Sequence, residues 1–265
     1  SKHSGFISND DGALVVNSGE IKGRLPDDKY IVETKYAKKN VWWNENGSDN
    51  KRLKPKSWDS IREHLIRDVK EKDLFVIDGY YNHDDKHKLA VRLITTEASA
   101  AYFFKLISIE LEDSEIKSFT PQWVMMHSPN TTIDNYKELC LNSSKVVATN
   151  LKCRESIFLG TFYATEITKS LLSITSYYLS LSNIGMFYCS ASVTTDDKSS
   201  VFFGLSGSVK TSLVLGNGKR ILTNEALAWT ESKGMYSLES GFSLKTSSFQ
   251  KDCPELKFSI SFTFV

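Results

Sequence analysis

The chain has 265 residues, 40% of them hydrophobic and 12% aromatic, so it can bury one large core or two modest ones and is too apolar to be disordered. Its 33 Lys and Arg residues against 32 Asp and Glu residues give a formal net charge of +1, which excludes a global electrostatic field that would attract nucleic acid or an anionic membrane. Any anion-binding site must therefore be local.

Short strands, a loop and a helix are predicted in the first quarter of the chain. Residues 13–16 and 30–32 predict short strands, and the Asn-Gly pair in residues 44–50 predicts a polar loop. A helix follows, and Ser57 is expected to cap its N-terminus. Apolar side chains recur at helical spacing on its inner face, namely Trp58, Ile61, Leu65, Ile66 and Val69.

The middle of the chain alternates strands with helices. Residues 74–78 and 89–94 predict a strand pair joined by a charged turn at 82–86, and residues 97–107 predict a helix. Further strands are expected at 123–126, 145–148, 157–162, 184–190 and 201–203, with a helix at 165–179. This alternation predicts a mixed α/β fold without internal repeats.

Cysteine spacing and hydropathy indicate a reduced, cytoplasmic protein. The four cysteines form no CxxC pair, so they suggest neither a zinc ribbon nor a compact disulfide framework. The first residues lack the apolar segment of a signal peptide. Residues 170–195 carry no charge, but Ser, Thr and Asn interrupt them too often for a membrane span. We expect a buried helix there, followed by a buried strand.

Residues 204–212 read GLSGSVKTS and follow the apolar run at 201–203. A phosphate-binding loop needs glycines that let backbone N–H groups face the phosphates, a lysine for the terminal phosphates and a Ser or Thr hydroxyl for the metal ion. The segment offers these groups, and residues 211–215 can open the following helix. Val209 replaces the glycine before the lysine. From this segment alone, an ordinary Gly-Ser turn is the alternative.

The last nine residues, 257–265, alternate Phe and Ile with Ser and Thr, which predicts a strand with one apolar face. Two arrangements are open for this strand. In the first, its apolar face and one edge are left exposed, which would invite aggregation. In the second, it folds back onto the strands near Val201 and Met235.

A series of further motifs runs along the chain. Residues 23–32 read GRLPDDKYIV, and residues 159–170 read LGTFYATEITKS. The later motifs are YCSA at 188–191, NEALAW at 224–229 and ESGFSLKT at 239–246. In order and approximate spacing, these segments resemble GRSPKDKYIV, GGTSYAGEIKKS, HCSA, DDEHGW and EGGCYAKT of the ATP-dependent phosphoenolpyruvate carboxykinases. The loop at 204–212 resembles that family's GLSGTGKTT.

The resemblance implies decarboxylation of oxaloacetate and transfer of the ATP γ-phosphoryl group to the enolate, giving phosphoenolpyruvate for gluconeogenesis. By motif position, Arg24 would hold the substrate carboxylate and Tyr163 would contact the substrate. The implied catalytic residues are Arg24, Tyr163, Lys169 and Lys210. The implied ATP-binding residues are Gly204, Leu205, Ser206, Gly207, Ser208, Lys210, Thr211, Ser212 and Lys245. The implied ligands of Mn²⁺ and Mg²⁺ are Lys169, Glu225 and Thr211, with Tyr188 and Asn224 at altered ligand positions. Taken singly, each of these residues has a structural alternative as a surface charge or a packed aromatic.

Departures from the family pattern predict weak binding of ATP, Mn²⁺ and Mg²⁺. Tyr188 stands where the family has a metal-binding histidine, and a phenol is a poor neutral ligand for Mn²⁺. Asn224 and Glu225 replace an aspartate pair, and Thr168 replaces the first lysine of a Lys-Lys pair. Val209 is strained by about 1 to 2 kcal/mol if the loop needs a left-handed conformation there.

We expect an N-terminal substrate domain at 1–183, of mixed α+β type, and part of a mostly β, phosphate-loop nucleotide domain at 184–265. The resemblance implies that the other half of the nucleotide domain is absent. Three hypotheses follow: an enzyme of reduced activity, a catalytically dead binding module, and a nonfunctional partial copy. A different phosphate-loop kinase is disfavoured by the flanking motifs. Small-molecule substrate and nucleotide are the expected partners, with no nucleic acid or membrane, and the oligomeric state is open.

Overall fold

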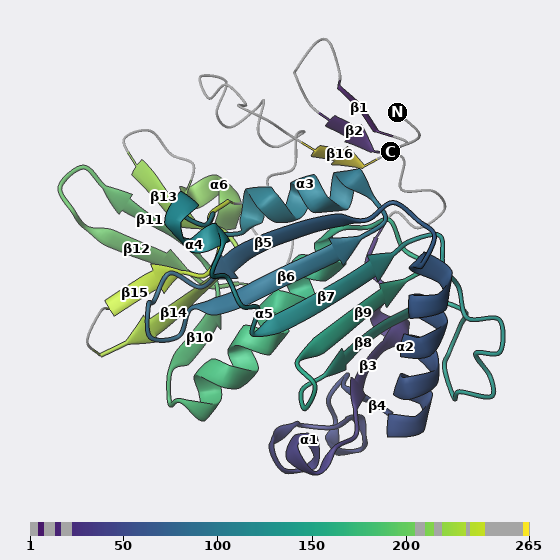
Figure 1. Ribbon diagram of the computed structural model, residues 1–265. Helices are drawn as coiled ribbons and strands as arrows, with labels where there is room; N and C mark the ends of the chain where they lie inside the picture. The colour runs from purple at the N-terminus through teal and green to yellow at the C-terminus, as the bar shows by residue number, and fades with distance from the viewer. Residues whose placement is uncertain are drawn as a thin grey trace.

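The computed structural model describes residues 5–7, 14–16, 23–204, 210–214, 219–231, 234–241 and 262–264. Its largest element is a seven-stranded mixed sheet with the strand order β4-β3-β8-β9-β7-β6-β5 (Figure 1). In chain order these strands are β3 (Lys29–Val32), β4 (Lys51–Leu53), β5 (Phe75–Tyr81), β6 (Leu89–Thr95), β7 (Trp123–Ser128), β8 (Val146–Asn150) and β9 (Glu155–Leu159). Neighbouring strands pair in parallel, except for β5 with β6 and β8 with β9. The predicted α/β class is confirmed.

Helices cover both faces of this sheet (Figure 1). One face packs against α2 (Pro55–Val69), and the other packs against α3 (Ala98–Ile107) and α5 (Thr165–Leu181). Successive side chains of a strand point to opposite faces, so Ile157 and Leu159 lie in the core under α2 while Phe158 lies in the core under α3 and α5. None of the helices in the described ranges is long and apolar enough to cross a lipid bilayer.

The predicted helix at α2 forms, but two details of the prediction are wrong. The helix begins at Pro55, not after a cap at Ser57, because proline is preorganised for the first helical position and needs no hydrogen bond there. Trp58, Ile61 and Leu65 are buried as expected, but Ile66 is 43% exposed. Ile66 lies one residue, or about 100°, beyond Leu65, so it lies outside the buried face of the helix.

The predicted helices at 97–107 and 165–179 correspond to α3 and α5. The side chain of Glu97 caps α3 by accepting a hydrogen bond from the backbone N–H of Ser99. The predicted strand pair is the antiparallel hairpin of β5 and β6, in register from Phe75 opposite Thr95 to Tyr81 opposite Leu89. The other helices are short: α1 (Lys35–Asn40), α4 (Asp113–Ile116) and α6 (Lys210–Val214), with 3₁₀ turns η1 (Pro26–Asp28) and η2 (Asn44–Asn46).

Two small antiparallel sheets follow α5 along the chain. Their strand orders are β10-β14-β15 and β12-β11-β13. The strands are β10 (Gly185–Tyr188), β11 (Ser190–Thr194), β12 (Ser199–Phe202), β13 (Lys219–Thr223), β14 (Ala226–Thr230) and β15 (Gly234–Ser237). Ala226, Ala228 and Leu238 are buried in the same core as Leu171 of α5, so this core continues past residue 183. The division into domains at 183 stays a prediction.

The buried strand expected after α5 is only partly correct. The predicted strand at 184–190 is split into β10 and β11, and the first half of β11 is buried. In β10, however, Phe187 is 37% exposed and Tyr188 is 55% exposed. An uncharged stretch does not reveal that β10 is an edge strand of its sheet.

Residues 262–264 of the predicted C-terminal strand form a strand whose partner differs from the one in the fold-back arrangement, and exposure of its apolar face stays a prediction. β16 (Phe262–Phe264) pairs in parallel with β2 (Leu14–Val16), and β2 pairs antiparallel with β1 (Gly5–Ile7). Figure 1 shows β1, β2 and β16 apart from the seven-stranded sheet. The strand therefore joins a sheet at the start of the chain and not the strands near Val201 and Met235.

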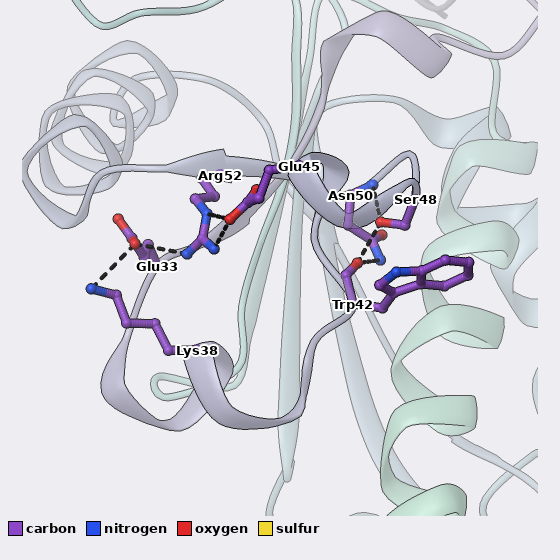
Figure 2. Close-up of polar contacts among 7 residues, drawn as sticks. All are labelled: Glu33, Lys38, Trp42, Glu45, Ser48, Asn50 and Arg52. Atoms are coloured by element: carbon purple, nitrogen blue, oxygen red, sulfur yellow. Dashed lines mark hydrogen bonds and ion pairs between the residues drawn. The ribbon is translucent and has the colours of Figure 1, made fainter.

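Two adjacent tryptophans lie in contrasting environments between α1 and β4. Trp43 is buried beneath Arg52, whose guanidinium carbon lies 4.3 Å from the ring centroid. Trp42 is 63% exposed, and its carbonyl oxygen accepts a hydrogen bond from Asn50 Nδ2 at 2.7 Å. Figure 2 shows the other polar side chains that fix this segment, which are Glu33, Lys38, Glu45 and Ser48.

Gly47→Ala is expected to lower the free energy of unfolding by about 1 kcal/mol. Gly47 follows η2 with a φ of 90°, a left-handed conformation that a Cβ atom disfavours. Gly47→Asn should be less destabilising, because Asn adopts this conformation more readily. Urea denaturation of both variants measures the difference in their free energies of unfolding. Equal losses of stability in the two variants would argue against the left-handed backbone conformation as the cause.

Candidate functional site

The turn before β3, which carries Arg24, is held by a carboxylate of α5. Glu166 is 1% exposed, and its Oε1 accepts a hydrogen bond from the backbone N–H of Leu25 at 2.6 Å. Its Oε2 lies 2.5 Å from Lys29 Nζ. One buried side chain of the first turn of α5 therefore fixes the residues on either side of η1, and with them the exposed Arg24.

Three cations lie close together at this turn. Burial lowers the pKa of Lys29 and Glu166 raises it, while the positive charges of Arg24 and Lys169 lower it further. Arg24 and Lys169 are 145 positions apart in sequence, and both are near enough to Lys29 for their charges to act on it. Sequence motifs pointed to Arg24 and Lys169 but gave no role to Lys29.

Lys169, on the next turn of α5, forms an ion pair with Glu225. Glu225 lies in the turn between β13 and β14, where its backbone N–H donates to Thr223 Oγ1 at 3.2 Å and its carbonyl oxygen accepts from the N–H of Cys189 at 3.2 Å. The turn is thus fixed from both sides. The structure brings together two residues, Lys169 and Glu225, that the motifs assigned to metal binding.

A second carboxylate, Glu239, lies beyond this pair. It is 7% exposed, and its Oε1 accepts a hydrogen bond from the hydroxyl of Tyr81 at 2.9 Å. Burial raises the pKa of Glu239 to about 7, the hydrogen bond from Tyr81 lowers it, and the charge of Glu225 raises it further. Motif reasoning gave Glu239 and Glu166 no role, although both occur in the motifs at 239–246 and 159–170. Their burial is the property that the sequence does not display.

Tyr188 and Asn224 complete the surroundings of Glu225. Desolvation raises the pKa of Tyr188, the charge of Arg24 lowers it, and Glu225 and Glu239 raise it further, so the phenol is protonated at neutral pH. The backbone carbonyl of Asn224 accepts a hydrogen bond from Ser190 Oγ at 3.3 Å. We call the group of interacting residues the site cluster: Arg24, Lys29, Tyr81, Glu166, Lys169, Tyr188, Glu225 and Glu239.

The predicted nucleotide residues are described only in part. Leu205, Ser206, Gly207, Ser208, Val209 and Lys245 lie outside the described residues. Gly204 follows β12, and Lys210, Thr211 and Ser212 open α6, so a strand precedes residues 205–209 and a helix follows them, as a phosphate loop requires. Lys210 Nζ donates a hydrogen bond to the carbonyl oxygen of Gly204 at 2.6 Å. This bond links the residue before the segment 205–209 to the residue after it. Lys210 also lies near Cys189, where its charge opposes the rise that burial causes in the pKa of the thiol.

Tyr163 lies in the turn that leads into α5. Its backbone N–H donates to Thr161 Oγ1 at 3.1 Å, and its carbonyl accepts from the N–H of Glu166 at 3.0 Å. The turn thereby places Tyr163 about one helical turn before Glu166, which meets Lys29, and nearly two turns before Lys169, which meets Glu225. Contact between Tyr163 and a substrate stays a prediction.

The donors of the site cluster do not fit a divalent cation well. Lys169 offers an ammonium in an ion pair, which has no lone pair for a metal, and Tyr188 offers a protonated phenol. Within the described ranges, no three His, Cys, Asp or Glu side chains form a group that could hold a metal ion. Glu225 is thus the single carboxylate among the predicted ligands, and it is engaged by Lys169.

Two surface hollows lie apart from the site cluster. One, of about 210 Å³, lies between α2 and the segment that joins β7 to β8, and is lined by Ser60, Glu63, His64, Arg67, Ile133, Asn135 and Leu139. The other, of about 450 Å³, lies at β11 and β13. The converging charges at α5 and β14, and not these hollows, make the site cluster the candidate functional site.

The model of a family described as phosphoenolpyruvate carboxykinase, of the ATP-dependent type, matches residues 2–265. The match includes every residue of the site cluster.

Proposed function

Because the chain belongs to the ATP-dependent phosphoenolpyruvate carboxykinase family, we propose that it converts oxaloacetate and ATP to phosphoenolpyruvate, ADP and CO₂ at a strongly reduced rate. The family implies a small-molecule substrate, a nucleotide and a divalent metal. The observation that carries the proposal is the convergence of Arg24, Lys29 and Lys169. Decarboxylation leaves an enolate, and fixed cations stabilise such developing negative charge.

In this proposal Arg24, Tyr163 and the residues of the phosphate loop keep the roles that the family resemblance implies. Arg24 binds the substrate carboxylate, where its planar guanidinium can donate two parallel hydrogen bonds. Tyr163 contacts the substrate from the turn before α5. Lys210 and the hydroxyls of Thr211 and Ser212 serve the nucleotide phosphates, together with the loop that begins at Gly204.

The reduced rate follows from the altered residues around Glu225. The ion pair with Lys169 and the phenol of Tyr188 occupy positions at which the resemblance implies metal ligands. We therefore expect both Mn²⁺ and Mg²⁺ to bind weakly. The same observation favours a second candidate function, a catalytically dead module that still binds the substrate anion.

A coupled assay for phosphoenolpyruvate from oxaloacetate, ATP and Mn²⁺ distinguishes the two functions. Slow product formation that is lost in Arg24→Gln supports the reduced enzyme. Substrate binding without any product supports the dead module. A turnover of about 10 per second, typical of enzymes in general, would show that the proposed reduction is wrong.

Restoring the family's residues should strengthen metal binding. The triple variant Tyr188→His, Asn224→Asp and Glu225→Asp is expected to bind Mn²⁺ at least about tenfold more tightly than the unchanged chain, because it regains an imidazole and a carboxylate pair. Calorimetric titration measures the affinity, and adding Lys169→Ala to the triple variant serves as the control. Tight stoichiometric Mn²⁺ binding by the unchanged chain would contradict the prediction.

A further inference from the structure

The positive charges of the site cluster are not equally neutralised. Lys29 pairs with Glu166 and Lys169 pairs with Glu225, but Arg24 is exposed and has no ion-pair partner among the residues that the structure describes. Both lysines also stay partly accessible, since their side chains are 25% and 18% exposed. Arg24, Lys29 and Lys169 therefore carry one positive charge more than the two carboxylates paired with them.

The pairing of Lys169 also changes what this position can offer a ligand. A lysine that binds a metal must present a lone pair, whereas an ammonium held by a carboxylate presents N–H donors. Glu225 is fixed by its backbone contacts to Thr223 and Cys189, so it holds the ammonium in one place. The ammonium is thus a positioned positive charge near enough to Lys29 to act on it, as Arg24 does.

We infer that the site cluster binds a small multianionic carboxylate directly through Arg24, Lys29 and Lys169, with no divalent metal between ligand and protein. The fitting ligands are dicarboxylates and enol phosphates, which carry two or more negative charges within a few atoms. Arg24 takes one carboxylate through its guanidinium, and the two ammonium groups take the remaining charge. The inference rests on the proposed function, because it assigns the substrate of that same site.

Calorimetric titration with phosphoenolpyruvate tests the inference in two buffers, one with excess EDTA and one with Mn²⁺. The dissociation constants in the two buffers are expected to agree within about threefold. Arg24→Gln should weaken binding by about tenfold or more in EDTA, since it removes a charge-assisted hydrogen-bonding group. Arg67→Gln, which removes an exposed arginine of α2 outside the site cluster, is the matched control and should change nothing.

Each other outcome overturns the inference in a distinct way. Binding that disappears in EDTA and returns with Mn²⁺ shows a metal-bridged ligand, which leaves the proposed function standing. Equal binding by Arg24→Gln and Arg67→Gln shows that the anion binds elsewhere. No binding in either buffer overturns the inference and also the substrate site of the proposed function.

Discussion

Glu166→Ala is expected to lower the free energy of unfolding by roughly 3 kcal/mol, which lies at the low end of the range for a broken buried ion pair because Lys29 is a quarter exposed. The variant removes the acceptor of the Leu25 N–H and the partner of Lys29 at once. Lys29 then lies in a largely buried place beside Arg24 and Lys169 without the carboxylate that offsets its desolvation. Urea denaturation at neutral pH measures the loss.

Two comparisons separate this explanation from a general effect of removing a glutamate. Glu166→Gln keeps an acceptor for Leu25 but not the charge, so its loss should be intermediate. Glu155→Ala breaks the pair with Arg62, which is 40% exposed, and should cost less than about 1 kcal/mol. If Glu155→Ala and Glu166→Ala were equally destabilised, Glu166 would have no special role at the turn.

Local signals in the sequence predicted most of the large sheet and its helices. The hairpin of β5 and β6, the helix α3 and the span of α5 all follow from hydrophobic period and turn chemistry, which act over a few residues. The exposure of Ile66 and of β10 did not follow, because exposure depends on where a neighbouring layer ends. The pairing of β16 with β2 joins opposite ends of the chain, and no local pattern encodes it.

The candidate site shows the same division between local and distant information. Motifs identified Arg24, Lys169 and Glu225 by type and order. They did not reveal Glu166 as the partner of Leu25, because these residues are 141 positions apart and neither has an unusual local pattern. The ion pair of Lys169 with Glu225 likewise spans 56 positions, and it determines whether this lysine is a donor or a ligand.

Two buried titratable groups are expected to give the protein opposing dependences of stability on pH. His127 is 2% exposed; its Nε2 donates to the Thr161 carbonyl at 2.9 Å, and its Nδ1 accepts from Thr95 Oγ1 at 2.8 Å. Burial lowers the pKa of His127 from 6.5 to about 4, partly opposed by the bond to Thr161. Between these values the unfolded chain binds the proton and the folded one does not, so this group lowers stability as pH falls.

Glu239 acts in the other direction over nearly the same range. Its pKa is raised from 4.5 to about 7, so between these values the folded protein holds a proton that the unfolded chain has lost. This group therefore lowers stability as pH rises from 4.5 to 7. Over its whole pH range, each pKa shift changes the free energy of unfolding by about 3 kcal/mol. The two effects should largely cancel between pH 4.5 and 6.5.

Glu239→Gln is expected to expose the contribution of His127. The amide can still accept the hydrogen bond of Tyr81, but it does not titrate, so the variant should lose about 3 kcal/mol more than the unchanged protein as pH falls from 7 toward 4. Urea denaturation at a series of pH values measures both profiles, and NMR titration of the His127 ring shows whether it stays neutral in the folded state. If the free energy of unfolding depended on pH in the same way in Glu239→Gln and in the unchanged protein, the prediction would be contradicted. A His127 ring that titrates near 6.5 would contradict it as well.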